Sequence, residues 1–346
     1  MIEFCFGVVA FMFTAYVVMD GFDLGSGALH LTVARTDEER RTVIAAIGPF
    51  WDGNEVWLLA GGGALFAMFP RVLASGLSGF YLAIFLVVWC LLLRGIALEF
   101  RSHLGDGLWR AFWDGTFVLA SALLPVLFGA ALGNVIRGVP LDRDGWFHLT
   151  LFTTFTARPP VGVLDWYTVL AGVFALVALL GHGAAFLAWR TEGAVHERSR
   201  TLAGRLYGVL AVLWPIATLA TWVVNPALFA ALPTRPFAWL GLALAIGGVA
   251  SVLVFGARAR PLAAFLGSCA FLTGMLVATA ACLYPVMLRS TDDPTLSITA
   301  LNGSASPASL AAALRWWSIG LPFVVLWFVL VFRIHRGRAR PAHEGY

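Results

Sequence analysis

The stretch that decides the fold reads PFWDGNEVW at residues 49–57, and it opens a segment that is otherwise apolar enough to cross a membrane. Leaving an ionisable side chain in hydrocarbon costs roughly 2.5–3.5 kcal/mol on insertion scales. Asp52 and Glu55 therefore need a physical reason to lie there. Such groups usually line a bundle interior, a cavity or an ion path.

The composition places the whole chain in a membrane. Hydrophobic residues make up 60% of it, charged residues 12%, and the mean hydropathy is +0.84, which excludes a water-soluble domain. A helical span takes about 20 mostly apolar residues. We predict one all-α membrane domain over residues 1–346, a bundle of about nine spans at 5–28, 48–69, 73–98, 112–135, 164–189, 203–224, 237–257, 261–286 and 311–333.

The basic residues predict the orientation of the chain. All 23 are arginine, and they alternate with the spans instead of forming one block, so the pI of about 9.1 does not indicate a nucleic-acid partner. With the N-terminus outside, sixteen arginines fall on one side and seven on the other. The positive-inside rule makes the richer side cytoplasmic, which places the C-terminus inside.

Two acids in the first span are candidates for function. Asp20 and Asp23 are three residues apart, so they can share a helix face. They lie toward the negative end of their helix, where carboxylates are disfavoured, and this favours a role such as proton relay. The alternative is a helix that ends early, at Gly21, with both acids hydrated at the interface.

The other acids have a simpler alternative. Asp52, Glu55 and Asp114 stand at predicted helix starts, where acids stabilise the dipole and cap free N–H groups. Arg94 and Glu99, near the end of the third span, are typical of interfacial groups that extend to water. Neutralisation of a buried acid by Arg94 is the competing interpretation.

Haem ligation is not predicted for this chain. It needs axial ligands at suitable depth and spacing, and His182 is the one clearly intramembrane histidine in the sequence. We interpret it as a hydrogen-bonded polar group between helices. The four cysteines lie in spans without paired spacing and are interpreted as small buried hydrophobes, so no metal site is predicted.

Several strings resemble one family. They are GFDLGSG at 21–27, PFWDGNEVW at 49–57, GGGALFAMFP at 61–70, RGIALEFR at 94–101 and FGAALGNVIRGVP at 128–140. In this order they resemble subunit II of the cytochrome bd quinol oxidases, including their cyanide-insensitive relatives. The resemblance is strongest over residues 15–140.

The resemblance implies a heterodimer in the bacterial cytoplasmic (inner) membrane. A larger subunit I would carry haem b and haem d, or haem b only, oxidise membrane quinol and reduce oxygen to water, which generates proton-motive force. This chain would bind no haem, stabilise subunit I and help to conduct cytoplasmic protons. Small single-span accessory subunits, and a structural quinone or phospholipid in this subunit, stay open.

The resemblance also assigns residues. Asp52 matches the acid of the family's proposed cytoplasmic proton path, and Asp20, Asp23 and Glu55 fall in its polar inner cluster. Phe50 stands where some members have histidine, so a relay through that histidine cannot operate unchanged here. Supporting polar or charged contacts are expected from Trp51, Asn54, Arg94, Glu99 and Asp114.

Two other functions remain open from sequence. A proton-coupled secondary transporter would also place acids in spans, but it predicts repeats and broken helices at the midplane, whereas these acids gather toward one leaflet. A purely structural membrane scaffold would use the same acids to cap helices and bind lipid head groups.

Overall fold

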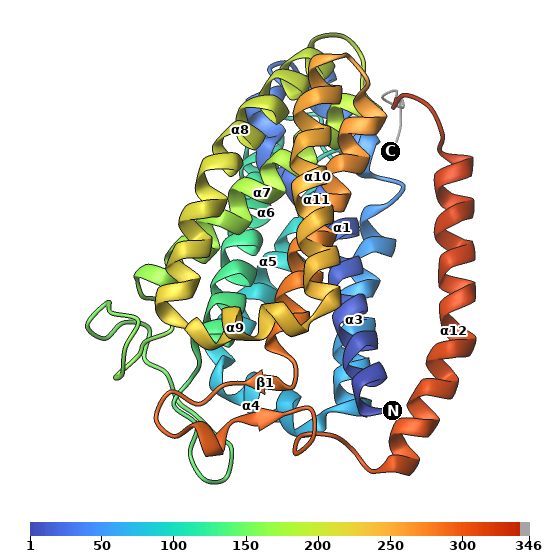
Figure 1. Cartoon of the computed structure of the whole chain (residues 1–346). Coiled ribbons are helices and arrows are strands. Elements are labelled where there is room, and N and C mark those ends of the chain that lie inside the picture. The colour runs from blue at the N-terminus through green and yellow to red at the C-terminus, as the bar shows by residue number, and fades with distance from the viewer. Residues whose placement is uncertain (340–346) are drawn as a thin grey trace.

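Long helices run side by side and form the body of the protein (Figure 1). The computed structural model describes residues 1–339. The elements are α1 (Ile2–Val33), α2 (Asp37–Ile47), α3 (Trp51–Met68), α4 (Pro70–Gly79), α5 (Tyr81–Phe100), α6 (Gly107–Arg137), α7 (Trp166–Arg190), α8 (Gly193–Val224), α9 (Pro226–Ala231), α10 (Pro236–Ala257), α11 (Pro261–Leu283), β1 (Val286–Leu288), β2 (Ile298–Thr299) and α12 (Pro307–Ile334).

Eight of these helices in residues 1–339 are long and apolar enough to span a membrane: α1, α5, α6, α7, α8, α10, α11 and α12. The predicted span 48–69 is α3, an 18-residue helix whose polar first turns lower its hydropathy. It still runs antiparallel beside α1, since Asn54 contacts Met19 and Gly61 faces Phe13.

The predicted span 73–98 is wrong at its start. Two helices occupy this region, α4 and then α5, with a break at Phe80. Pro70 is the first residue of α4, a position that suits proline because it cannot continue a preceding helix. The transmembrane element is therefore α5 alone.

Several helices extend beyond the predicted spans. α1 continues without interruption to Val33, so the early end at Gly21 is wrong. α6 begins at Gly107, where the Asp106 side chain accepts from Trp109 N, and α8 begins at Gly193. These extensions contain charged residues, which end a hydropathy segment but do not end a helix, because helical hydrogen bonds need no apolar side chains.

Helix α1 lies inside the bundle and contacts α3, α6, α7 and α11. Its backbone meets that of α7 directly: a Cβ added to Gly25 would lie 1.9 Å from the carbonyl oxygen of Leu179, and one added to Gly183 would lie 2.3 Å from the carbonyl carbon of Gly25. Small residues allow this close helix approach in membranes. The glycine pair fixes the distance between α1 and α7.

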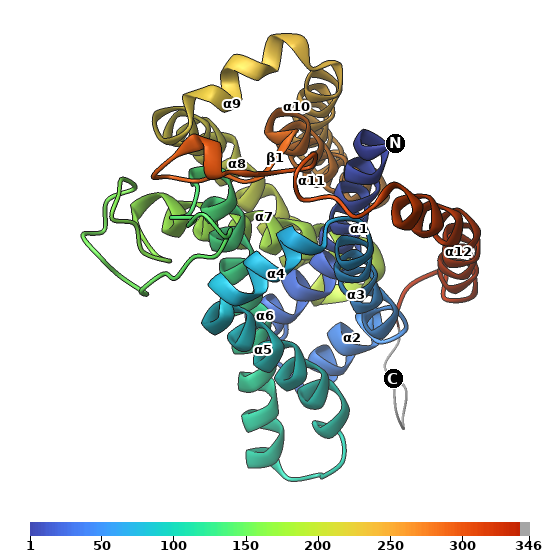
Figure 2. The ribbon, with the colours of Figure 1, turned by 90° about the horizontal axis from the view of Figure 1, so that it is seen from below.

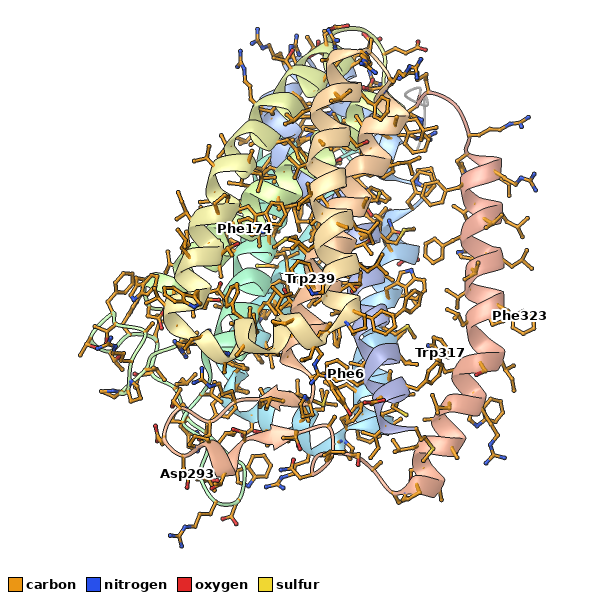
Figure 3. The ribbon with its side chains drawn as sticks, in the orientation of Figure 1. Phe6, Phe174, Trp239, Asp293, Trp317 and Phe323 are labelled. Carbon is orange, nitrogen blue, oxygen red and sulfur yellow. The ribbon has the colours of Figure 1, made fainter. Side chains whose placement is uncertain are left out.

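Helix α12 stands at the edge of the bundle, beside α1 and α3 (Figure 2). Trp317 points toward the bundle and meets Phe4 and Phe11 edge-to-face at 6.1 and 6.3 Å, whereas Phe323 points away (Figure 3). Phe323 is 69% exposed. The outer face of α12 is therefore apolar, as suits contact with lipid or with another membrane subunit.

The two ends of the bundle differ. Strands β1 and β2 pair antiparallel in the loops at the lower end of Figure 1, where the N-terminus also lies; this small sheet is the exception to the all-α prediction. The other end, which we call the arginine-rich end, carries Arg40, Arg101, Arg110 and Arg198, and α12 finishes there. Its assignment to the cytoplasm stays a prediction.

Gly25→Ala should destabilise the protein by about 1–3 kcal/mol, the usual cost of overpacking, because the new methyl group meets the α7 backbone. The thermal unfolding midpoint in detergent measures this. Gly208→Ala in α8 is the matched control, since its Cβ would have nothing within 4 Å. Equal midpoints for the two variants would contradict the close packing of α1 on α7.

Candidate functional site

An arginine pairs with two carboxylates inside the bundle. Arg94 Nη1 on α5 donates to Asp20 Oδ1 on α1 at 2.7 Å, and Arg94 Nη2 pairs with Glu55 on α3. The Arg94 side chain is 1% exposed and that of Asp20 is fully buried. Arg94 is therefore a buried group paired with a buried acid and not an interfacial group that extends to water.

A second contact joins the same helices. Asn54 Nδ2 on α3 donates to Asp23 Oδ2 at 2.7 Å and to the carbonyl oxygen of Met19 at 3.1 Å, both on α1. Five side chains from three helices thus meet, and we call them the carboxylate–arginine cluster: Asp20, Asp23, Asn54, Glu55 and Arg94.

The cluster holds more acceptors than it satisfies. Asp20 Oδ2, Asp23 Oδ1 and Asn54 Oδ1 are buried without a hydrogen-bond partner among residues 1–339. The cluster has three carboxyl groups and one guanidinium, which contacts Asp20 and Glu55 but not Asp23. Because an unpaired buried charge is costly, these acceptor atoms are places where a proton or a water molecule can bind.

Exposure rises from the cluster toward the first turn of α3. Asp20 is fully buried, the Glu55 side chain is 26% exposed, and Asp52, in the first turn of α3, is exposed. Asp52 is thus outside the cluster and one helical turn from Glu55. The first-turn interpretation fits Asp52 but not Glu55, which pairs with Arg94.

Two of the expected supporting residues lie beside the cluster. Trp51 packs over α5, where a Cβ added to Gly95 would lie 3.4 Å from its ring. Glu99 is exposed near the end of α5. Neither side chain contributes to the contacts that define the carboxylate–arginine cluster.

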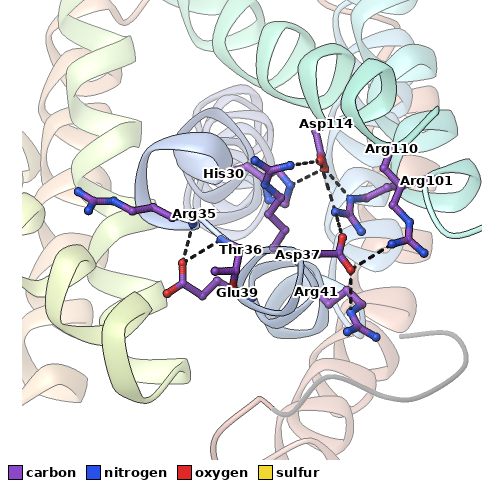
Figure 4. A network of polar contacts seen from close by, with 10 residues as sticks. His30, Arg35, Thr36, Asp37, Glu39, Arg41, Arg101, Arg110 and Asp114 are labelled. Atoms are coloured by element: carbon purple, nitrogen blue, oxygen red, sulfur yellow. Dashed lines mark hydrogen bonds and ion pairs between the residues drawn. The ribbon is translucent and has the colours of Figure 1, made fainter. Parts of the chain in front are cut away.

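A second polar cluster surrounds Asp114 at the arginine-rich end (Figure 4). Asp114 accepts from Arg101 Nε at 2.5 Å, His30 Nε2 at 2.7 Å and Arg40 Nη1 at 3.0 Å, and it is 1% exposed. Arg101 also donates to Asp37 of α2 at 2.7 Å. We call these five residues the α2 network. Its contacts join α1, α2, α6 and the end of α5.

The helix-start interpretation of Asp114 is wrong. α6 begins seven residues before it, so Asp114 lies beyond the first turn and binds three cationic or imidazole groups instead of backbone N–H groups. Sequence reasoning missed His30 as a site residue because the predicted first span stopped at residue 28. The available signal was its spacing, seven residues after Asp23, which puts both on one helix face.

His182 has the role expected from sequence. Its Nδ1 lies 2.7 Å from Ser268 Oγ and its Nε2 lies 2.9 Å from the carbonyl oxygen of Val18, so it is a hydrogen-bonded group between helices. The four cysteines are free thiols.

An ion pair between Glu39 and Arg198 joins α2 to α8. It closes the capping box of α2 with Thr36, and its Oε2 accepts from Arg198 Nη1 at 2.8 Å and from Arg35 N at 2.6 Å. The Arg198 hydrogen bond, followed by the backbone donors, lowers the pKa of Glu39 to about 2 from its ordinary 4.5. The contact is therefore strong only while Glu39 is ionised.

These features define a class: a polytopic helical membrane protein with a buried carboxylate–arginine cluster between three of its helices. The family described as cytochrome bd terminal oxidase subunit II matches residues 1–335. The chain belongs to this family. The eight apolar helices within residues 1–339 and this membership make it a multi-pass protein of the bacterial inner membrane.

Individual relatives agree. The chain is similar to the cytochrome bd-I ubiquinol oxidase subunit 2 of Escherichia coli K12, with 37% identity over 63% of this chain and 55% of that protein, so the match spans about half of its length. It is also similar to the probable cytochrome oxidase subunit 2 of Haemophilus influenzae, with 29% identity over 89% of this chain and 86% of that protein.

A solved structure shares the fold. A chain of the bd oxidase from Geobacillus thermodenitrificans superimposes with a TM-score of 0.75 and covers 97% of this chain and 98% of its own length, at 18% identity. At that identity the comparison supports the fold alone.

Arg94→Leu should destabilise the protein by about 3–5 kcal/mol, because it leaves buried carboxylates without their cation. The yield and thermal midpoint of the purified protein measure the loss. Arg94→Leu combined with Asp20→Asn and Glu55→Gln should recover part of it, while Arg315→Leu, at an exposed position of α12, is the control. An equal loss in the single and triple variants would contradict the ion-pair account.

The Glu39 contact should depend on pH. Its folded-state pKa is depressed, so its contribution to stability is fully present above the ordinary value of 4.5 and is lost as the pH falls through about 2. Glu39→Gln should lower the thermal midpoint at pH 7, and the gap from the parent should narrow as the pH falls below 4.5. A gap that stays constant down to pH 3 would refute this assignment.

Proposed function

We propose that this chain is subunit II of a cytochrome bd-type quinol:oxygen oxidoreductase. Family membership and the printed names of the Escherichia coli and Bacillus subtilis relatives, both ubiquinol oxidase subunits, support this. The partner is a haem-bearing subunit I, the reductant is a membrane quinol, and oxygen is reduced to water in the complex. Family membership favours this function over a coupled secondary transporter.

The redox centres belong to the partner in this proposal. Haem b and haem d, or haem b alone, lie in subunit I, and this chain stabilises that subunit without ligating haem. The state of His182 supports this division, because both of its ring nitrogens are engaged by Ser268 and the Val18 carbonyl and neither is free to bind iron.

This chain helps to supply protons for oxygen reduction. The observation that carries this proposal is the gradient of exposure along Asp52, Glu55 and Asp20, from exposed through 26% to fully buried. Asp52 takes up a proton at the surface, Glu55 receives it one turn deeper, and Asp20 and Asp23 hold it inside. Arg94 bridges Glu55 to Asp20 and offsets part of the negative charge of the cluster.

The direction of transport follows from the predicted orientation. If the arginine-rich end faces the cytoplasm, the protons consumed at the oxygen-reduction site come from inside the cell. Quinol oxidation near the outer face then separates charge across the membrane and contributes to the proton-motive force. Phe50 offers no ionisable group beside Asp52, so Glu55 is the next carrier.

An apolar cavity is the proposed binding site for a structural quinone or phospholipid, the ligand that the sequence analysis left open. It has a volume of about 360 Å³ and lies between α1, α6, α7, α8, α10 and α11. Its lining includes Phe128, Phe174, Trp214 and Phe271. Such a lining suits the apolar part of a quinone or a phospholipid, so we place that ligand here.

Asp20→Asn and Glu55→Gln should lower oxygen consumption with quinol by roughly 10²-fold, the low end of what a positioned proton-transfer group contributes, at unchanged haem content. Asp52→Asn should have a smaller effect, since exposed carriers can be replaced by water. Asp293→Asn, on the opposite loop, is the control. Normal turnover by fully haem-loaded amide variants would reject proton conduction and leave the scaffold function.

A further inference from the structure

The polar residues in the inner part of α1 form one continuous stripe. Tyr16, Asp20, Asp23, Ser26 and His30 are spaced by four, three, three and four residues, which places them on a single helix face. All five are buried. The stripe passes through the carboxylate–arginine cluster and ends at the α2 network, so it joins two sites that share no hydrogen bond described above.

Several buried side chains between these two sites have polar atoms without a hydrogen-bond partner among residues 1–339. Asp23 Oδ1, Ser26 Oγ and His30 Nδ1 are buried without a partner among residues 1–339, and so is Ser121 Oγ of α6. Ser121 faces the same stretch, because a Cβ added to Gly27 would lie 2.3 Å from its hydroxyl oxygen. A buried polar group without a partner is destabilising, and buried water usually satisfies such groups.

The hydrogen-bonding capacity of these four atoms suits water as their partner. Asp114 is a carboxylate held by Arg40 and Arg101, so it accepts from His30, and His30 Nε2 carries the proton. The other ring nitrogen, Nδ1, is then an acceptor. Acceptors therefore stand at both ends, Asp23 and His30, with the two serine hydroxyls between them. A water molecule has two O–H donors, so it can donate to one of these acceptors and to a serine hydroxyl or a second water.

The distance requires more than one water. Asp23 and His30 are seven residues apart, about 10 Å along the helix axis at 1.5 Å per residue. One hydrogen bond spans about 3 Å. Ser26, four residues before His30, supplies one intermediate group, and two or more waters complete the connection.

We propose that this part of the stripe holds a short chain of internal water molecules, and that His30, oriented by Asp114, is the positioning residue that fixes its far end. The inference rests on the proposed function and deepens it. A proton that Asp23 releases passes to the adjacent water: the carboxyl O–H bond breaks, an O–H bond forms on that water, and that water gives one of its own protons to the next water of the chain. The same transfers in reverse return a proton to the Asp23 carboxylate. Asp23 thereby exchanges protons inside the bundle without passing them through Asp52.

The surroundings of His30 favour its neutral, positioning role. Asp114 and the Phe117 ring face it from α6, Arg40 and Asp37 lie on α2, and Arg101 comes from the end of α5. The Phe117 ring meets the imidazole edge-to-face at 5.4 Å. Arg40 and Arg101 balance the charges of Asp114 and Asp37, so no excess negative charge remains to hold an imidazolium.

The direct test is a high-resolution cryo-electron microscopy map of the whole oxidase complex. Ordered water should appear within hydrogen-bond distance of Asp23 Oδ1, Ser26 Oγ and His30 Nδ1. A map that resolves other buried waters but shows none here would overturn the proposal.

The functional test uses the same complex with two substitutions of one residue. His30→Leu removes the acceptor, so turnover should fall severalfold and its solvent deuterium isotope effect should rise, because proton exchange becomes limiting. His30→Gln keeps an amide donor for Asp114 and an acceptor for water, and it should restore both values. His182→Leu is the matched buried-histidine control, and its isotope effect should equal that of the parent.

The outcomes separate the two proposals. Loss of turnover in Asp23→Asn together with a parental isotope effect in His30→Leu would reject the water chain and keep the proton-conduction function. Normal turnover in Asp23→Asn would reject proton conduction, and the map would still decide whether water occupies the stripe. Failure of His30→Gln to restore turnover would reject the positioning role.

Discussion

The position of one guanidinium constrains the rest of this bundle. Arg94 lies away from water on α5 and is held by Asp20 of α1 and Glu55 of α3. A buried cation needs such partners, so α1, α3 and α5 must meet at this level, and Asn54 ties α3 to Asp23 of α1 at the same point. The cluster is the polar centre of the fold, and the proposed proton conduction rests on the same residues.

Helix α1 makes polar contacts on one face and close backbone contacts on another. Its polar stripe faces acids, amides and arginines from α3, α5 and α6, while Gly25 brings its backbone into contact with α7. Close packing on one side keeps the ionisable groups of the other side in register with their partners. A shift of α1 along its axis by one residue would move its polar groups by about 1.5 Å. This is half the length of a hydrogen bond, so it would break the contacts of these groups.

Much of this could be predicted from sequence, for physical reasons that particular residues show. Asp20, Asp23, Asn54, Glu55 and Arg94 stand out because charge and amide groups are rare in apolar segments. The pairing of these residues could not be predicted from sequence, since Arg94 and Asp20 are 74 residues apart and helix spacing rules apply only to residues close in sequence. Asp114 and His30 were misplaced because hydropathy reports where apolar side chains end, whereas α1 and α6 extend several residues further.

The weak hydropathy of α3 bears on how the chain is made. A translocon releases a helix into lipid according to its own apolarity, and α3 begins with two acids and an asparagine within its first five residues. Its partners on α1 are synthesised before it, but Arg94 emerges about 40 residues after Glu55. We therefore expect the nascent α3 to integrate as a hairpin with α1, and Glu55 cannot meet Arg94 until α5 has left the ribosome.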